Sequence, residues 1–562
     1  MFIKVTNSGP RRYVQLVEAF RDEAGLPKQR TVATLGRLDQ LNSGLDSVIS
    51  GLLRVTGRKT PETSAPEVEF ECARDFGDVW TLNELWNTLG FDRMRVLFRR
   101  TRHAIDVESL IRVMVFNRLC DPDSKLGVLR WLETVSMPGL KGQAVEHQHL
   151  LRAMDALIAQ HEAVENVLSG LLRPLVDQDL AVVFYDMTTI RTEGLSEQSD
   201  DLRRFGMSKE GIVARQVMLG VVQTAEGLPL YHEVFEGNTA EVTTLKPTIK
   251  KIIERFPVKR VIAVADRGLL SIDNLQELQS ISLPGGGKLE FILAVPGRRY
   301  SEFVELLAPL QDKCSNASEE VISQVAWNQL RLVVAHNPKA AREASAKRDA
   351  VIKALEEQAL AWTGKLEAQD AGKVARGRKL SDGGARARFY HEVCEAHLTR
   401  IVKVDLKSEL FSYAIDDKAL AHARLMDGKL LLVTNAADLS PKDIVGRYKS
   451  LADIERGFRV LKSEIEIGPV YHRLPDRIRA HASICFMALI LYRVMRSRLK
   501  AGESHLSPER ALAKLRRIQH QKIVLNKSAP LSGLSTITQE HSQILSALSI
   551  KKPSLDPQMS LL

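Results

Sequence analysis

The chain has 562 residues, of which 44% are hydrophobic, so it is too long for a single core and apolar enough to form several domains. Its 79 Lys and Arg residues outnumber its 69 Asp and Glu residues, and the net charge of +10 favours a polyanionic partner, with nucleic acid as the first candidate and an acidic membrane surface as the second. The five cysteines lie far apart along the chain, which excludes a local zinc knuckle or redox pair.

The sequence shows no sign of export or of a membrane span. Its first residues, MFIKVTNSGPRRY, lack the apolar segment of a signal peptide. The longest apolar run, Ile484 to Tyr492, is much shorter than the about 20 residues that cross a bilayer. We therefore expect a soluble cytosolic protein with reduced cysteines and no membrane partner.

The N-terminal part of the chain changes from a strand pattern to a helix pattern. Residues 1–60 alternate apolar and polar side chains in FIKV, YVQLVEAF and TVATLG, which predicts a small β-rich region with three strands. Residues 61–179 show helical periodicity, as in VESLIRVMVFNRLC, and predict a helical domain. Its basic positions, such as Arg99 and Arg100, fit DNA-end binding and an ordinary solvated face equally well.

Residues 180–284 predict an α/β unit. The apolar run LAVVFYDMTT predicts a buried strand, and residues 215–238 predict two strands around an Ala-Glu-Gly turn. An amphipathic helix over residues 244–256 then leads into a fourth strand, VKRVIAVADRG. Strand, hairpin, helix and strand in this order are typical of an α/β domain.

The remaining chain predicts an interruption followed by helices. Residues 285–430 are of mixed type, with a solvated helix from 339, a flexible Gly-rich loop at KLSDGGARAR, and strand-like runs on both sides. Residues 431–500 predict one continuous helix over 441–462 and a second over 475–498. Residues 501–562 predict a C-terminal tail that is helical at first and then loose.

Two aspartates interrupt apolar strands. Asp186 lies within VVFYDMTT, and Asp266 directly follows VIAVA. A carboxylate buried in a strand costs free energy unless it is paired or binds a metal. Each aspartate alone fits a turn cap about as well as a functional group. Together they fit neighbouring parallel strands whose carboxyl ends meet at one site, where both could coordinate the same ions.

A third acidic candidate lies on the predicted helix YKSLADIERGFRVLK. Tyr448, Glu455 and Lys462 are spaced seven apart, so a continuous helix would place them within about 20° of each other per step, beside Arg459. Glu455 and Arg459 alone would be an ordinary i,i+4 pair worth a few tenths of a kcal/mol. The joint spacing of Tyr, Glu and Lys favours a functional face.

These motifs together resemble the DDE transposases of bacterial insertion sequences, in the subgroup with the Y-(2)-R-(3)-E-(6)-K signature. Tyr448, Glu455 and Lys462 match the signature in register, whereas Leu451 stands at its arginine position. Arg456 and Arg459 are the residues that could replace this arginine. The resemblance also covers YDMTT at Asp186, GLPLYHEVFEGNT, ADRG at Asp266 and PVYHRLPDRIRAH.

The resemblance implies a multidomain α/β protein with an RNase H-like mixed sheet, flanking helices and an insertion domain after the second aspartate. It implies a transposase that cleaves DNA at insertion-sequence ends and transfers the strand into target DNA. Asp186, Asp266 and Glu455 would hold two Mg²⁺ ions, or Mn²⁺ in their place. Its partners would be double-stranded DNA of the terminal repeats and of the target, bound by a homodimer in the bacterial cytoplasm at the nucleoid.

The resemblance also implies DNA contacts outside the carboxylates. Lys462 would hold a phosphate by its charge and Tyr448 by a hydrogen bond, although either residue could instead be solvated or packed. Trp327 is a better candidate than Trp362 for stacking a flipped base, although a packing role is commoner for tryptophan. His472 and Arg473 belong to a segment that resembles the family and would reach DNA.

Two other functions fit the same residues. One is a nuclease of the same fold that cuts DNA without strand transfer, which the sequence separates poorly from a transposase. The other is a transposase-derived DNA-binding regulator, against which the presence of all three carboxylates argues.

Overall fold

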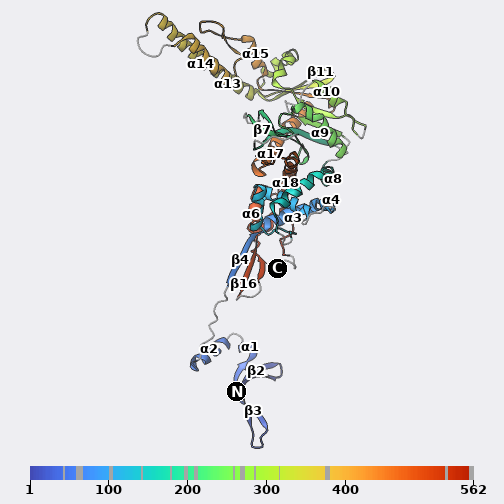
Figure 1. The fold of residues 1–562 in the computed structure, drawn as a ribbon, viewed down its shortest axis with the longest axis vertical. Helices are drawn as coiled ribbons and strands as arrows, with labels where there is room; N and C mark the ends of the chain where they lie inside the picture. The colour runs from blue at the N-terminus through green and yellow to red at the C-terminus, as the bar shows by residue number, and fades with distance from the viewer. Residues whose placement is uncertain are drawn as a thin grey trace. The chain divides into compact units, whose positions relative to one another are not determined.

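The structure is a computed structural model that describes most of the chain, in two compact units (Figure 1). The first unit is Met1–Cys72 with Lys522–Ser532, and the second is Ala73–Gln521 with Gly533–Leu562. Some residues, Glu455 among them, are described by their backbone alone. The described ranges are 1–41, 45–57, 68–99, 106–140, 144–176, 180–194, 200–207, 213–256, 260–265, 272–283, 286–315, 317–373, 380–525 and 530–555.

The first unit contains the predicted N-terminal sheet. Strands β1 (Phe2–Ser8), β2 (Arg11–Arg21) and β3 (Pro27–Arg37) form a three-stranded antiparallel sheet in that order. Helices α1 (Leu38–Leu41) and α2 (Leu45–Val55) follow. The sequence prediction of three strands is confirmed. The predicted boundary at residue 60 lies outside the described residues.

Helices form most of the predicted helical region, but its beginning contains a strand, β4 (Val68–Asp75), where a helix pattern was expected. Asp106 caps helix α5 by accepting a hydrogen bond from the Ser109 N–H, and Ser124 caps α6 in the same way through Gly127. Almost every residue of α5 is buried, which explains why it is apolar all round. The main helices are α3 (Gly77–Leu89), α5 (Val107–Cys120), α6 (Lys125–Thr134), α7 (His147–Ala159) and α8 (His161–Leu172).

A mixed sheet, nine-stranded over the described residues, is the centre of the second unit. Its order is β11-β12-β15-β10-β9-β5-β7-β6, and β8 also pairs with β7. Strand β5 runs antiparallel to β7 and parallel to β9, which gives the mixed sheet with flanking helices that the resemblance implies. The strands are β5 (Leu180–Arg191), β6 (Arg204–Met207), β7 (Val213–Thr224), β8 (Pro229–Glu236), β9 (Arg260–Ala265), β10 (Glu290–Ala294), β11 (Val321–Trp327), β12 (Leu330–His336) and β15 (Lys429–Thr434).

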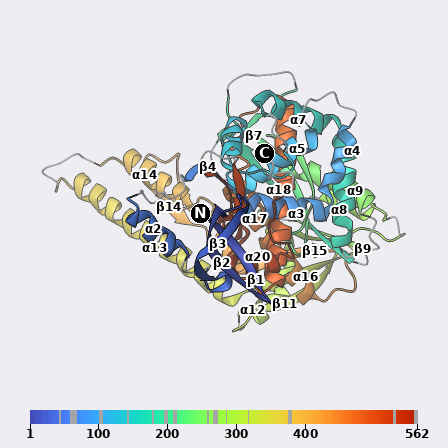
Figure 2. The same cartoon turned by 90° about the horizontal axis from the view of Figure 1, so that it is seen from below.

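Residues 285–430 contribute both to this sheet and to a separate module. Strands β10, β11 and β12 lie in the main sheet, and β15 spans the predicted boundary at 430. Between β12 and β15, helices α13 (Pro338–Asp370) and α14 (Asp382–Glu395) lie side by side (Figure 2). They share an apolar core of their own, centred on Phe389, with β13 (Val402–Val404), β14 (Tyr413–Ile415) and α15 (Asp417–Met426).

The Gly-rich segment in this module is more ordered than its composition predicts. A flexible loop was expected at KLSDGGARAR, but helix α14 begins at Asp382 within it. The Ser381 hydroxyl accepts a hydrogen bond from the Gly384 N–H, which caps the helix. Phe389 and Val393 then bury the apolar side of α14 against α13. A cap and two core contacts thus outweigh the low helix propensity of two glycines.

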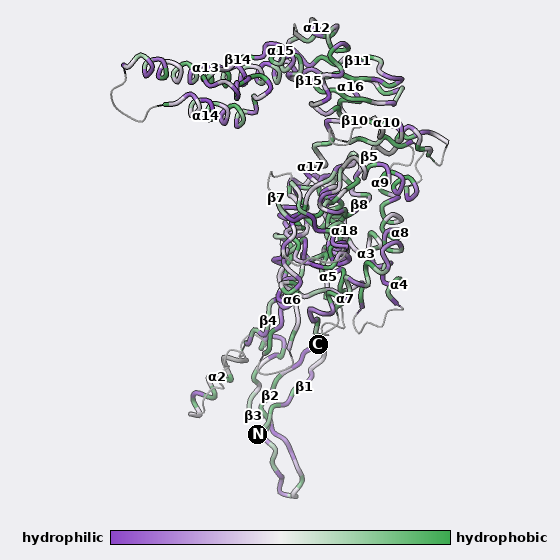
Figure 3. The backbone as a smooth tube through the Cα atoms, turned by 45° about the horizontal axis from the view of Figure 1, so that its top comes forward, coloured by the Kyte–Doolittle hydropathy of each residue, from purple (hydrophilic) through white to green (hydrophobic). Residues whose placement is uncertain are grey.

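Helix α18 (Pro475–Ala501) is the central helix of the second unit. It packs against α5, α7 and β8 (Figure 3). In the described part of the chain it is the one helix long and apolar enough to cross a membrane, judged by length and composition alone. Its most apolar window is 94% buried inside the fold, as in a core helix, so it is weak evidence for a span.

The C-terminal region is more structured than the predicted loose tail. After α19 (Pro508–Leu515), strands β16 (Gln519–Leu525) and β17 (Leu531–Leu534) form a three-stranded sheet with β4 (Val68–Asp75), in the order β17-β16-β4. Helix α20 (Gln539–Ala547) then packs against α18 and α19. Because the partner strand β4 lies more than 400 residues away in sequence, local polarity could not reveal this sheet.

Candidate active site

Asp186 lies on the central strand β5. Only 8% of the residue is exposed, and its Oδ1 accepts a hydrogen bond of 2.7 Å from the N–H of Met187. The strand forms because VVFYDMTT is rich in β-branched and aromatic side chains, and Tyr185 and Met187 beside the aspartate are fully buried. The apolar strand thus holds a carboxylate in the interior of the fold.

Asp186 points to the face of the sheet that α18 covers. Residues directly opposite each other in an antiparallel pair project to the same face, and Asp186, Val221 and His232 form such a row across β5, β7 and β8. The His232 ring stacks on Phe486 of α18 at 4.3 Å, and its Nε2 shares a hydrogen bond of 3.1 Å with the Ser483 Oγ. Burial lowers the pKa of His232 to about 4, so this ring is neutral.

The second aspartate follows the strand next to β5. Strands β5 and β9 are parallel neighbours, as the sequence predicts, and Ala265 at the end of β9 pairs with Tyr185. The residues that follow these two partners in the sequence are Asp266 and Asp186. Asp266 itself lies outside the described residues. The pairing of β5 with β9 therefore ends just before the two aspartates, although β5 itself continues to Arg191.

Helix α17 (Ala452–Arg459) carries Glu455 and packs against β5. The side chain of Glu455 lies outside what the structure describes. Gly457, two residues later, allows a close approach of the helix: a Cβ atom there would lie 3.2 Å from the Gln223 Oε1 and 3.2 Å from an Arg493 nitrogen. The absence of a side chain at Gly457 thus lets the helix that carries Glu455 approach Gln223 of β7 and Arg493 of α18.

The prediction of one continuous helix over 441–462 is wrong. Helix α16 (Pro441–Lys449) ends in a turn at Ser450 and Leu451, where the Leu451 N–H donates to the Tyr448 carbonyl at 2.9 Å. After α17, a π-helical turn covers Val460–Glu464. The seven-residue spacing therefore does not place Tyr448, Glu455 and Lys462 on one straight stripe. Leu451, at the arginine position of the signature, is buried in the core.

The other predicted contact residues of this region differ in exposure. Tyr448 and Lys462 are half-buried, and Tyr448 borders the main core. Arg456 and Arg459 are exposed on α17. Of the basic positions in the helical region, Arg99 is exposed, whereas 100–105 lie outside the described residues.

The two tryptophans considered for base stacking both contact aromatic rings. Trp327, at the end of β11, is half-buried and lies 5.0 Å from the Phe303 ring. Trp362 on α13 packs on Phe389 and Phe411, each at 6.3 Å, in the core of the inserted module.

His472 and Arg473 lie away from α17, in a pocket that the sequence did not predict. They line it together with Arg118 and Lys125 of the helical region. Burial lowers the pKa of His472 to about 4, with help from the charges of Lys125 and Arg477. No local motif marks Arg118 or Lys125, because only the tertiary fold brings them next to the YHR segment.

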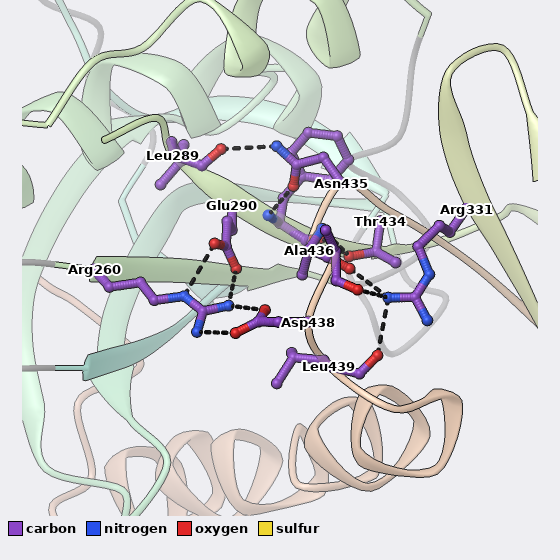
Figure 4. A network of polar contacts seen from close by, with 11 residues as sticks. Arg260, Leu289, Glu290, Arg331, Thr434, Asn435, Ala436, Asp438 and Leu439 are labelled. Carbon is purple, nitrogen blue, oxygen red and sulfur yellow. Dashed lines mark hydrogen bonds and ion pairs between the residues drawn. The ribbon is translucent and has the colours of Figure 1, made fainter. Parts of the chain in front are cut away.

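A polar network at the opposite end of β9 holds the chain that leads into α16 (Figure 4). Arg260, the first residue of β9, donates to both carboxylate oxygens of Glu290 and to those of Asp438. Arg331 donates to the carbonyls of Ala436, Ala437 and Leu439 in the same loop. The sequence analysis did not single these residues out, although oppositely charged residues at the starts of neighbouring strands β9 and β10 are a weak signal.

The donor set suits a hard divalent cation. Asp186, Asp266 and Glu455 offer carboxylate oxygens, which Mg²⁺ and Mn²⁺ prefer, and a buried strand carboxylate such as Asp186 needs a compensating charge. Among the residues that the structure describes, no group of three His, Cys, Asp or Glu side chains could hold a metal. That search includes neither Asp266 nor the side chain of Glu455.

Comparisons with known proteins identify two transposase domains in the sequence. The IS1634 family transposase N-terminal domain matches residues 3–65, and the Transposase DDE domain matches residues 177–491. A cryo-EM structure of a piggyBac transposase synaptic complex with hairpin DNA is similar over 86% of this chain and 82% of that chain, at 9% identity and a TM-score of 0.38. No curated protein matches the chain. Because the Transposase DDE domain covers more than half of the sequence, the chain belongs to the DDE transposases of insertion sequences.

Proposed function

We propose that this transposase cleaves DNA at the ends of its insertion sequence and joins the freed strand to target DNA, with Asp186, Asp266 and Glu455 as its metal-binding carboxylates. The observation that carries the proposal is the register of β5 and β9, in which Tyr185 pairs with Ala265 and an aspartate follows each. Because the pairing of the two parallel strands stops at these residues, we expect both aspartates to lie close together at the carboxyl end of β9.

The three carboxylates would hold two Mg²⁺ ions, with Mn²⁺ as a substitute. When bound, such ions stabilise charge on the entering and leaving oxygens of an in-line displacement. The protein holds the first ligand rigidly, because Asp186 is anchored on a buried strand and accepts the N–H of Met187. Helix α17 contacts β5, and Gly457 lets it pack closely on the neighbouring β7 and α18, which supports Glu455 as the third ligand.

The DNA phosphates beside the cut would be held by Lys462 and Tyr448. Lys462 supplies a positive charge and Tyr448 a hydroxyl donor, and both lie half-buried around α17. The exposed Arg456 and Arg459 offer further positive charge, in place of an arginine at the position of Leu451. The protein would act on DNA ends as a homodimer, so that two ends are joined in one complex.

A cleavage and strand-transfer assay tests this function. The substrate is labelled duplex DNA carrying the element ends, incubated with Mg²⁺ or EDTA, for the wild type and for Asp186→Asn, Asp266→Asn and Glu455→Gln. We expect Mg²⁺-dependent joined products that all three substitutions abolish. Cleavage without joining would instead support a nuclease of the same fold. DNA binding without metal-dependent chemistry would leave a transposase-derived regulator.

A further inference from the structure

A pocket of about 910 Å³ lies between the helical region and the segment that follows α17. One wall is the turn between α5 and α6, with Arg118 and Lys125, and the other is 466–474, with His472 and Arg473. Helices α7 and α18 complete it through His147, Arg477 and His481. All these residues belong to the second unit, and all are described.

Two buried cations in this pocket lack an acidic partner. Lys125 is 6% exposed, and no ion pair or side-chain hydrogen bond joins it to any described residue. Arg118 is 5% exposed and donates only to backbone carbonyls, those of Asp123, Ile465 and Glu466. Its Nε has no partner among the described residues. Burying unpaired charge costs several kcal/mol, so two neighbouring cations of this kind require an anion.

The acidic residues of the pocket do not supply that anion. The Asp123 carboxylate accepts from the Ser124 N–H and pairs with Arg130 at 3.2 Å, and no ion pair joins it to Lys125. Glu466 is exposed at the rim, and it is the backbone carbonyl of Glu466 that binds Arg118. The positive charge of Arg118 and Lys125 is therefore not cancelled within the described part of the pocket.

Three helices begin at the pocket, and the N-terminus of α6, capped by the neutral Ser124, adds to its positive potential, whereas Glu146 caps α7 and Asp476 lies in the first turn of α18. Helices α6, α7 and α18 start at Lys125, His147 and Pro475, within or next to the lining residues. Each is at least eight residues long, and a helix N-terminus carries roughly half a positive charge. Unpaired buried cations together with a helix N-terminus form a site for a phosphate-sized anion.

The pocket is tied to the strand of Asp186. Val470, in its wall, donates its N–H to the Arg191 carbonyl at 2.9 Å and accepts from the Glu193 N–H at 2.9 Å. The bridge partner of Val470, Thr192, lies six positions after Asp186, about 20 Å along an extended strand. Successive phosphates of one DNA strand rise about 3.4 Å along the duplex axis, so about 20 Å along that axis corresponds to roughly six base pairs.

We propose that this pocket binds a backbone phosphate of the DNA whose cut site lies at the carboxylates, roughly six base pairs from the cut. The inference rests on the proposed function and adds a second anchoring point to it. Lys125 and Arg118 neutralise the phosphate from within the pocket, and Arg473 covers it from the exposed rim. A contact so far from the cut fixes the direction in which the duplex crosses the active site.

Salt-dependent binding of the full chain to labelled element-end duplex tests the proposal. Each lost phosphate contact makes the slope of log K against log salt less negative by about 0.9. We expect Lys125→Met and Arg473→Gln each to weaken DNA binding about tenfold at 0.15 M salt. Each substitution should also make the slope of log K against log salt less negative by about 0.9, the loss of one phosphate contact. Arg473→Gln changes an exposed residue, so it keeps the test valid if Lys125→Met fails to fold.

Matched controls separate this proposal from the function on which it rests. Lys353→Met removes an exposed lysine beside Glu357 on α13 and should leave both affinity and slope unchanged. Asp186→Asn should bind DNA with the same slope of log K against log salt as the wild type but should not cut it. If the wild type binds and cuts DNA and both pocket variants bind it with unchanged affinity, the proposal of a phosphate contact in the pocket is contradicted, while the proposed function stands. Wild-type protein without DNA binding would overturn the function as well.

A small-anion arm identifies the source of the phosphate. Inorganic phosphate at 10 to 100 times the DNA concentration, as an order-of-magnitude range for a far weaker ligand, should neither stabilise the protein nor displace the duplex. Thermal stabilisation by phosphate that Lys125→Met abolishes, together with unchanged DNA binding in that variant, would assign the pocket to a free anion and contradict the proposal.

Discussion

Tyr185 and Ala265 lie directly opposite each other on the parallel strands β5 and β9, and in the sequence an aspartate follows each of them. Each residue ends an apolar run of the sequence, and the pairing of β9 with β5 stops at these two residues, while β5 continues to Arg191. This register links a sequence pattern to one location in the fold. The predictions below test the site and the elements that support it.

Replacement of Asp186 by Asn should abolish cleavage without unfolding the protein. Asn has almost the same volume and can still accept the Met187 N–H, but it carries no charge for a cation. A bound metal contributes several kcal/mol to the transition state, so we expect a loss of about 100-fold or more in cleavage rate. Single-turnover kinetics measure the loss. Asp443→Asn, on the exposed start of α16, is the control and should retain full activity.

A side chain at Gly457 should disturb the site through α17. In Gly457→Leu the new atoms would press on Gln223 and Arg493, because the Cβ alone would lie 3.2 Å from each. We expect a cleavage rate reduced at least about tenfold with DNA affinity retained, since a misplacement of about 1 Å can cost 100-fold in rate. Gly446→Leu on α16 is the matched control, because nothing lies within 4 Å of its Cβ position. Equal activity in the two variants would show that close packing at Gly457 is not required.

Loss of Arg260 should loosen the chain that leads into α16. This residue joins Glu290 and Asp438, whose carboxylates raise the pKa of Arg260. Hydrogen bonds to charged groups contribute about 1.5 to 3 kcal/mol, so Arg260→Gln should lower the free energy of unfolding by about 2 kcal/mol in urea denaturation. Asp438 is largely exposed, so Asp438→Asn should lower the free energy of unfolding by less than about 1 kcal/mol. A larger loss of stability in Asp438→Asn than in Arg260→Gln would contradict the assignment of Arg260 as the centre of the network.

Lys125→Met should stabilise the DNA-free protein. Burial lowers the pKa of Lys125 to about 7, with help from the charge of Arg118, while the unfolded pKa is near the model-peptide value of about 10.4. Below pH 7 the lysine is charged in both states, and its full burial cost is present. Between pH 7 and 10 the unfolded state binds more protons, so that cost declines as pH rises.

Lys125→Met should therefore raise the free energy of unfolding, measured by urea denaturation, by on the order of a few kcal/mol, and by more at pH 6 than at pH 9. The pKa values of His472 and His481 are lowered by burial, so neither ring changes its charge in this window. A gain that does not depend on pH would contradict an unpaired, charged Lys125. The charged and titratable groups around it are Arg118, Asp123, His147, Glu466, His472, Arg473, Arg477, His481 and Cys485.

The sequence predicted the parts of the fold that depend on local periodicity. The strand of Asp186, the hairpin after it and the parallel strand before Asp266 are all present, because each is an apolar run bounded by turn residues. The break at Leu451 was missed, since the apolar spacing of the segment suits a continuous helix. A buried leucine and a tight turn, both tertiary features, decide the outcome there.

The pocket around Lys125 could not be predicted from the sequence. Its two walls are separated by more than 300 residues, and although one wall includes the family-like segment PVYHR, nothing in the sequence places Arg118 or Lys125 beside it. Composition gave only the excess of positive charge. Similarly, strands β16 and β17 pair with a strand from the beginning of the chain, so their polar sequence resembles a loose tail. Contacts between distant segments account for both omissions.

The most direct test of the central claim is metal rescue of Asp186→Cys. A thiolate is a poor ligand for Mg²⁺ and a good one for softer ions. If Asp186 binds the catalytic metal, cleavage of element-end DNA by this variant should be lost in Mg²⁺ and partly restored by Mn²⁺ or Zn²⁺, while Asp186→Ala stays inactive with every ion. Full cleavage by Asp186→Cys in Mg²⁺, or no restoration by any softer ion, would contradict a metal-binding role for Asp186.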